Sequence, residues 1–173
     1  STLQAGTAEL VASVYSTANS QLKQSLAQYA AYGVTAPTLT ANNYATELDK
    51  LVKQLSAIFS EENITAQVRA GVLKQVLPKF NMDQNTYNNL PANDKTKAAI
   101  DGYVTAAMQG AEAQAQLKAA KEQAAAGLKQ ITDLKAQLEK VNKYQAGVNN
   151  YTNGVASAAS GATELKAGTA ELY

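Results

Sequence analysis

Two groups of acidic side chains are the most reactive features that the sequence places close together. Glu61 is followed directly by Glu62, and Asp94 precedes Asp101 by about two helical turns. Paired carboxylates can bind a cation or divide the roles of acid and base between them. Neither pair has a nucleophile beside it or the spacing of a cation-binding loop, so we interpret both as solvated helix ends.

The other common catalytic groups are missing or badly placed. The chain contains no cysteine and no histidine, which excludes thiolate chemistry, disulfides, Cys/His zinc sites and the usual general base. Serine and lysine are plentiful, but no Ser-x-x-Lys motif precedes an apolar pocket, and no glycine-rich phosphate loop is present. We therefore predict that the protein is not an enzyme, with no catalytic residues, no metal and no cofactor.

The charge balance narrows the choice of partner. With 15 basic and 14 acidic side chains the net charge is +1, too small to neutralise many phosphates. We expect no nucleic acid partner, and no direct binding to an anionic membrane. No run of about 18 apolar residues could span a bilayer, so any membrane contact is expected through flanking segments that are not in this chain.

The elements that carry these side chains are predicted to be helices, because the chain is rich in Ala, Leu, Gln and Lys. A first helix is expected over residues 1–32, ended by Gly33 and Pro37. Apolar residues at helical spacing predict a second helix around 48–59 and a third around 64–77. An Asn-rich loop follows at 79–93, and one long helix is expected from about Asn93 to the C-terminus.

A hexapeptide repeat links the two ends of the chain. Ala-Gly-Thr-Ala-Glu-Leu occupies residues 5–10 and recurs letter for letter at 167–172. The second copy lies in a heptad array whose apolar positions are spaced three and four apart, which is typical of helices packed side by side. We call these positions the seam. The seam residues are Leu3, Leu10, Val14, Val141, Tyr144, Val148, Tyr151, Val155, Leu165 and Leu172.

Glycines accompany the seam at intervals of seven residues. Each one costs a helix about 1 kcal/mol relative to Ala, so their regular placement needs a reason. We predict that they allow the backbones of two helices to approach closely; the alternative is that they only weaken the helix. The predicted close-packing glycines are Gly6, Gly147, Gly154, Gly161 and Gly168.

These patterns predict an all-α fold, an elongated antiparallel helical hairpin or coiled-coil stalk with a small helical head. The predicted domains are an N-terminal stalk helix at 1–33, a helical head at 34–110, and a long returning stalk helix at 111–173. Most large aliphatic residues lie between Leu48 and Met108, where we expect a core. Tyr87, in the Asn-rich loop, is the candidate partner-binding side chain, because Tyr suits half-wet interfaces.

The heptad region resembles a known family. The run from Tyr151 to Leu172, with Gly154, Gly161 and Gly168 seven residues apart, is similar to the Leu-x-x-Gly heptads of the YhgE/Pip (phage infection protein) family. The resemblance covers about residues 140–172 well and residues 1–14 partly. Tyr151 and Ala158 stand where the family has Leu. The resemblance implies a bacterial membrane protein with an extracytoplasmic helical region, and it brings no catalytic residues.

The function expected from these features is a non-catalytic surface binding or scaffold module at the extracytoplasmic side of a bacterial cell membrane. The resemblance implies a protein partner such as a bacteriophage, for which the protein would be a receptor, or a secretion component. Two alternatives stay open. One is the external domain of a transporter or of a type VII secretion component. The other is a self-assembling coiled-coil segment, in which the seams of a homodimer pair between chains.

Overall fold

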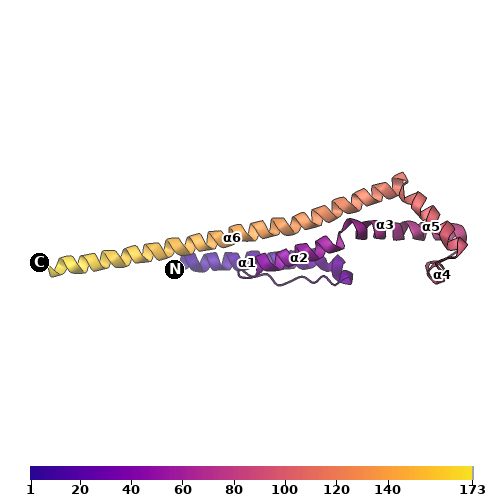
Figure 1. Ribbon diagram of the computed structural model, residues 1–173. Helices are drawn as coiled ribbons and strands as arrows, with labels where there is room; N and C mark the ends of the chain where they lie inside the picture. The colour runs from indigo at the N-terminus through magenta and orange to yellow at the C-terminus, as the bar shows by residue number, and fades with distance from the viewer. Residues whose placement is uncertain (173) are drawn as a thin grey trace. The chain divides into compact units, whose positions relative to one another are not determined.

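A computed structural model describes residues 1–172 of the chain. Every regular element in this range is a helix, so the prediction of an all-α fold is confirmed. The elements, in chain order, are α1 (Thr2–Leu26), the 3-10 helix η1 (Ala27–Tyr32), α2 (Tyr44–Ile58), α3 (Glu61–Val76), the 3-10 helix η2 (Leu77–Phe80), α4 (Gln84–Asn89), α5 (Lys95–Met108) and α6 (Ala111–Glu171), and Figure 1 labels the six α-helices.

The chain divides into two units that are not the predicted domains. The first unit combines Ser1–Leu51 with Ile131–Tyr173, and the second is the continuous stretch Val52–Gln130. The predicted boundaries, after residues 33 and 110, differ because α2 is shared. Its first residues, including the fully buried Leu48, belong with the two chain ends.

Helix α1 starts and stops where the local chemistry predicts. Ser1 and Gln4 form a reciprocal capping box at its first turn, which satisfies backbone N–H groups that have no helical partner. The chain continues through η1 to Gly33, whose φ of 76° lies in the left-handed region that glycine adopts without strain. The first helical segment therefore ends as expected from the sequence.

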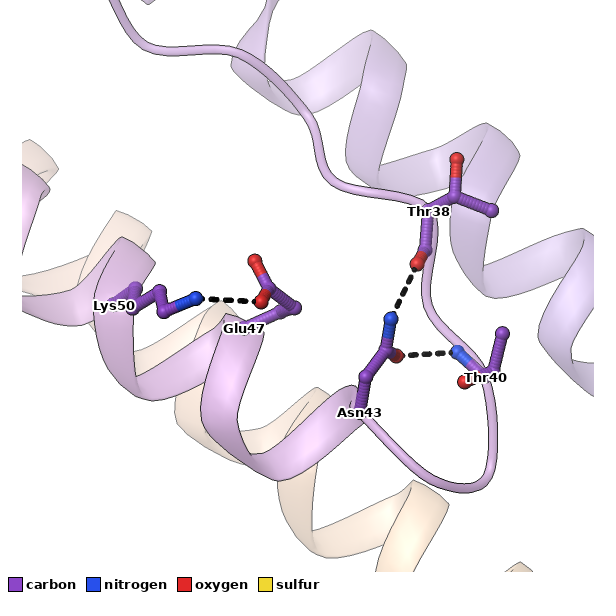
Figure 2. Close-up of polar contacts among 5 residues, drawn as sticks. All are labelled: Thr38, Thr40, Asn43, Glu47 and Lys50. Carbon is purple, nitrogen blue, oxygen red and sulfur yellow. Dashed lines mark hydrogen bonds and ion pairs between the residues drawn. The ribbon is translucent and has the colours of Figure 1, made fainter.

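The segment between η1 and α2 is held by two asparagines. Asn19 of α1 accepts a hydrogen bond from the Leu39 N–H at 2.7 Å and donates one to the Leu39 carbonyl at 3.1 Å. Asn43 accepts from the Thr40 N–H at 2.7 Å and donates to the Thr38 carbonyl at 3.0 Å (Figure 2). These bonds satisfy the backbone of a segment that has no regular structure, and they bring the chain to the start of α2.

The second unit has its own core, made mainly by α3 and α5. Its helices begin at polar caps: Ser60 for α3, Asp83 for α4 and Asp94 for α5. The expected core between Leu48 and Met108 is thus present in part, without the first half of α2. The buried members of this cluster are Val72, Val76, Leu77, Ile100, Val104, Met108 and Ala113.

The predicted long helix from Asn93 to the C-terminus is wrong at one point. It is interrupted at Gln109 and Gly110, between α5 and α6. The N–H groups of both residues bond to carbonyls three residues back, which tightens the last turn of α5. Gly110 lies at this interruption, whereas Gly102 and Gly127 lie inside continuous helices.

Candidate interaction surface

In the first unit, α1 lies antiparallel to the C-terminal part of α6. Gln4 near the start of α1 bonds to Asn153, and Tyr15, further along α1, donates to the Asn142 side chain at 3.1 Å. Residue numbers therefore increase along α1 in the direction in which they decrease along α6.

The seam residues predicted in the first half of α1 are not the ones it buries. Leu3 is 49% exposed and Leu10 is 55% exposed, while Val14 is half-buried. The stripe buried there lies next to them on the helix surface and also includes polar side chains. Periodicity alone does not favour it, since the predicted stripe is as apolar. The buried residues of α1 are Thr7, Val11, Tyr15, Ala18, Leu22 and Leu26.

On α6, too, the buried residues lie beside the predicted seam. Ile131 and Leu138 are buried, and Val141 and Val148 are only half-buried. The two tyrosines of the seam, Tyr144 and Tyr151, are 55% and 67% exposed. Their predicted role as filling between α1 and α6 is therefore wrong, because α6 directs its amide side chains toward α1 instead.

These amides make contacts that the sequence analysis did not predict. Asn142 accepts from Tyr15 and also donates to the Ala41 carbonyl at 3.5 Å, so it joins α6 to α1 and to the segment before α2. Burial raises the pKa of the Tyr15 hydroxyl, and the bond to Asn142 opposes that rise only partly. Asn142 lies beside the seam residue Val141 and not at a seam position, so the heptad pattern carried no signal for this contact.

Four of the seam residues line two open hollows between α1 and α6. The first, of about 470 Å³, is lined by Leu3, Gly6 and Leu10 of α1 together with Tyr144 of α6. The second, of about 300 Å³, lies further along α1 beside Val14, Leu134 and Leu138. We call the surface that holds these two hollows the seam groove.

Helix α2 covers the opposite flank and does not fill the seam groove. Asp49 of α2 pairs with Lys135 of α6 at 2.7 Å, and the ring of Tyr44 packs edge-on against that of Tyr15. Successive residues of an α-helix point 100° apart, which places Lys135 and Asn142 on one flank of α6 and Val141 and Tyr144 on the other. The seam groove therefore faces away from α2.

Beyond the groove, the last part of α6 extends past its contact with α1. Every residue from Asn153 to Leu172 is exposed, and α6 visibly continues past the N-terminal end of α1 (Figure 1). We call residues 154–172 the tail; Asn153, just before it, still bonds to Gln4. Its seam residues Val155, Leu165 and Leu172 are 52%, 71% and 84% exposed. The repeated hexapeptide at 167–172 thus stands free, whereas its first copy lies on α1.

The predicted close packing of the glycines is wrong within the chain. A Cβ atom built on any of them would meet no atom within 4 Å. The reason is that the seam beside them is not covered by another helix. The glycines concerned are Gly6, Gly147, Gly154, Gly161 and Gly168.

Tyr87 lies in the second unit, apart from the seam groove. Its hydroxyl donates to Asp101 at 2.5 Å, and the Lys97 ammonium lies 5.0 Å from the centre of its ring. The bond to the Asp101 carboxylate raises the pKa of the Tyr87 hydroxyl, with burial adding to the effect. Tyr87 therefore holds α4 against α5. Its predicted role in binding a partner stays a prediction.

Three of the four acidic side chains of the two predicted pairs have partners of their own in the structure. Asp94 caps α5, and Asp101 accepts from Tyr87. Glu61 pairs with Lys121 at 2.5 Å, and this partner holds the pKa of the Glu61 carboxyl below its ordinary value. Within residues 1–172, no three acidic side chains come together in a cluster that could hold a metal ion.

Two further observations concern the whole described chain. None of its helices combines the length and the apolar character needed to cross a membrane. Comparison of the sequence with protein-family models and with curated proteins, and of the fold with solved structures, found no match.

Proposed function

We propose that the protein is a non-catalytic binding or scaffold module that holds a helix of a protein partner in the seam groove. The observation that carries the proposal is the exposure of apolar residues from two helices on one side of the first unit. Leu3 and Leu10 of α1 stand beside Tyr144 of α6 around one hollow. A contiguous apolar patch of this kind is typical of an interaction site.

The spacing of the exposed residues favours a helical partner. Apolar side chains spaced three and four residues apart form a stripe along a helix. The spaces between them accept the apolar stripe of another helix. Tyrosine at the rim can bury its ring while its hydroxyl stays in water. The resemblance in the heptad region supports the wider proposal that this module is an elongated stalk with a head in the extracytoplasmic region of a bacterial membrane protein.

Binding to the seam groove can be tested with two synthetic helical peptides of identical composition. One peptide carries Leu and Ala at alternating spacings of three and four, and the other has the same residues scattered around the helix. We expect the first to bind and the second not to bind, as measured by fluorescence anisotropy. Equal binding of both peptides would contradict a groove that recognises an apolar stripe.

A pair of matched substitutions identifies the surface. Tyr144→Glu places a charge on the wall of the groove and should weaken binding of the striped peptide at least about tenfold, or ~1.4 kcal/mol. Tyr32→Glu is the control, because Tyr32 is 54% exposed, nearly the same as Tyr144, but does not line the groove. If both variants bind alike, the seam groove is not the binding site.

The cellular location has a separate test. Intact cells that express the full-length protein are treated with a protease that cannot enter them, and this segment is followed with a specific antibody. We expect cleavage of the segment in intact cells. Cleavage that appears only after lysis would overturn the extracytoplasmic location and leave the groove unaffected.

A further inference from the structure

We propose that the seam groove and the tail bind α6 of a second copy of this chain, as a parallel dimer with the two seams in register. The inference rests on the proposed function, because it names the partner of the same surface. Each step below uses the residues left exposed in the first unit.

The exposed apolar residues are concentrated on this one surface. Among the described residues, nine large hydrophobic side chains are about half exposed or more, and only Tyr32 and Tyr103 lie off the seam. The other seven run from the groove to the end of the tail, with Ala158 and Ala162 at the seam positions between Val155 and Leu165. They are Leu3, Leu10, Tyr144, Tyr151, Val155, Leu165 and Leu172.

Their area approaches that of a dimer interface. Half of the 150–250 Å² that a large aromatic side chain buries is an upper value for Leu and Val, so the seven side chains offer at most roughly 700 Å² per copy. A specific interface of standard size takes about 800 Å² from each partner. A helix that contacts only the tail would leave the groove uncovered, whereas a second α6 reaches both.

The residue types along the seam are compatible with a two-stranded parallel pair. The first of the two seam positions is β-branched at Val141, Val148 and Val155, each followed by Tyr or Ala at the second, and the second is Leu at Leu165 and Leu172. In parallel pairs, β-branched residues at the first position favour two strands over three or four. A parallel pair also brings each tail against the same tail of the partner.

The edges of the seam present no obstacle to this pairing. Glycine directly precedes the first seam position in three heptads, at Gly147, Gly154 and Gly161, and each has open space around it. In a parallel pair, side chains at this edge lie against those at the opposite edge of the partner. The charged residues at the two edges, Lys140 and Lys166, lie at opposite ends of the seam and do not face each other.

Single cysteines test the dimer and its direction in the complete chain, which has no cysteine of its own. Ala158→Cys and Ala162→Cys lie on the seam, and Ala167→Cys is the control on the outer face of the same helix. In a parallel pair in register, each seam cysteine meets its own counterpart, so both should form disulfide-linked dimers under mild oxidation. Ala167→Cys should not.

The other outcomes overturn the inference. If only one of the two seam cysteines forms a disulfide, the helices are antiparallel about that position. If neither forms one more readily than Ala167→Cys, the seams do not pair between copies. Sedimentation equilibrium of the unmodified chain must also show a dimer that dissociates on dilution, and a monomer at all concentrations would contradict the proposal.

A charge on the tail separates this inference from the proposed function. Leu165→Glu should weaken the dimer at least about tenfold without affecting the fold, because Leu165 is 71% exposed in the single chain. Ala167→Glu is its control and should leave the dimer unchanged. The striped peptide should still bind the monomeric Leu165→Glu variant through the intact groove. Peptide binding without any dimer supports the proposed function alone, and absence of both contradicts both.

Discussion

The side chain of Asn19 should make a measurable contribution to the stability of the first unit. It forms two hydrogen bonds with the backbone of Leu39, whose side chain is 2% exposed. Asn19→Ala removes both bonds and leaves a backbone N–H and a carbonyl of Leu39 without these partners. At about 1 kcal/mol of net stabilisation per bond, we expect a loss of about 2 kcal/mol.

A second substitution separates the two bonds. Asn19→Asp keeps an oxygen that accepts from the Leu39 N–H but replaces the donor to the Leu39 carbonyl with another acceptor. Two acceptors that face each other repel, so we expect this variant to be no more stable than Asn19→Ala. Asn150→Ala, on the exposed side of α6, controls for loss of an asparagine as such.

The measurement is urea unfolding followed by circular dichroism, together with hydrogen exchange of the Leu39 amide. A loss of about 2 kcal/mol should lower the midpoint without a change of slope, and the Leu39 amide should exchange faster. If Asn19→Ala and Asn150→Ala unfold at the same urea concentration, and the Leu39 amide exchanges as before, the two bonds do not hold the segment before α2.

Three further changes test other parts of the structure. Leu22→Ala should destabilise the first unit by about 2–5 kcal/mol in urea unfolding, because the side chain is 2% exposed; a loss below that of Asn150→Ala would contradict its place in the core. Asp101→Asn should lower the pKa of Tyr87 toward 10.0, measured by ultraviolet titration against a Tyr87→Phe reference, and an unchanged pKa would contradict the bond. Because the folded pKa is the raised one, this bond stabilises the second unit below the unfolded pKa, and the contribution is lost as the pH rises through the folded pKa. Gly161→Ala should stabilise the tail helix by up to about 1 kcal/mol in thermal melts, since a Cβ there meets nothing within 4 Å, and a lower melting temperature would reveal a hidden contact.

The helices were predictable because each carries its own local signals. Ser60 and Asp94 cap α3 and α5, as a polar residue before an apolar run predicts. Gly33 ends the first helical segment because few other residues adopt its conformation without strain. The break at Gln109 was missed because glycine alone does not end a helix: Gly102 and Gly127 are accommodated within helices.

The side of α1 that packs against α6 was not predictable from the pattern. Leu3 and Leu10 make a stripe as apolar as that of Val11 and Tyr15, and periodicity does not say which of two neighbouring stripes will be covered. The choice follows from α2, which arrives on one flank through the Asn19 bonds. A prediction based on the repeat at the two chain ends considers only two helices. It therefore placed the seam between α1 and α6 and did not include α2.

The division of the chain has a consequence for the order in which it folds. The second unit is one uninterrupted stretch, Val52–Gln130, and can complete its core while later residues are still being synthesised. Helix α1 must wait until the residues around Leu138 exist, more than a hundred positions later in the chain. During that delay the apolar face around Leu22 is open to water and to other chains, and contacts of such long sequence separation form slowly. We expect the segment from Ser1 to Leu51 to be where nascent chains are most exposed to misassembly and where a chaperone would bind.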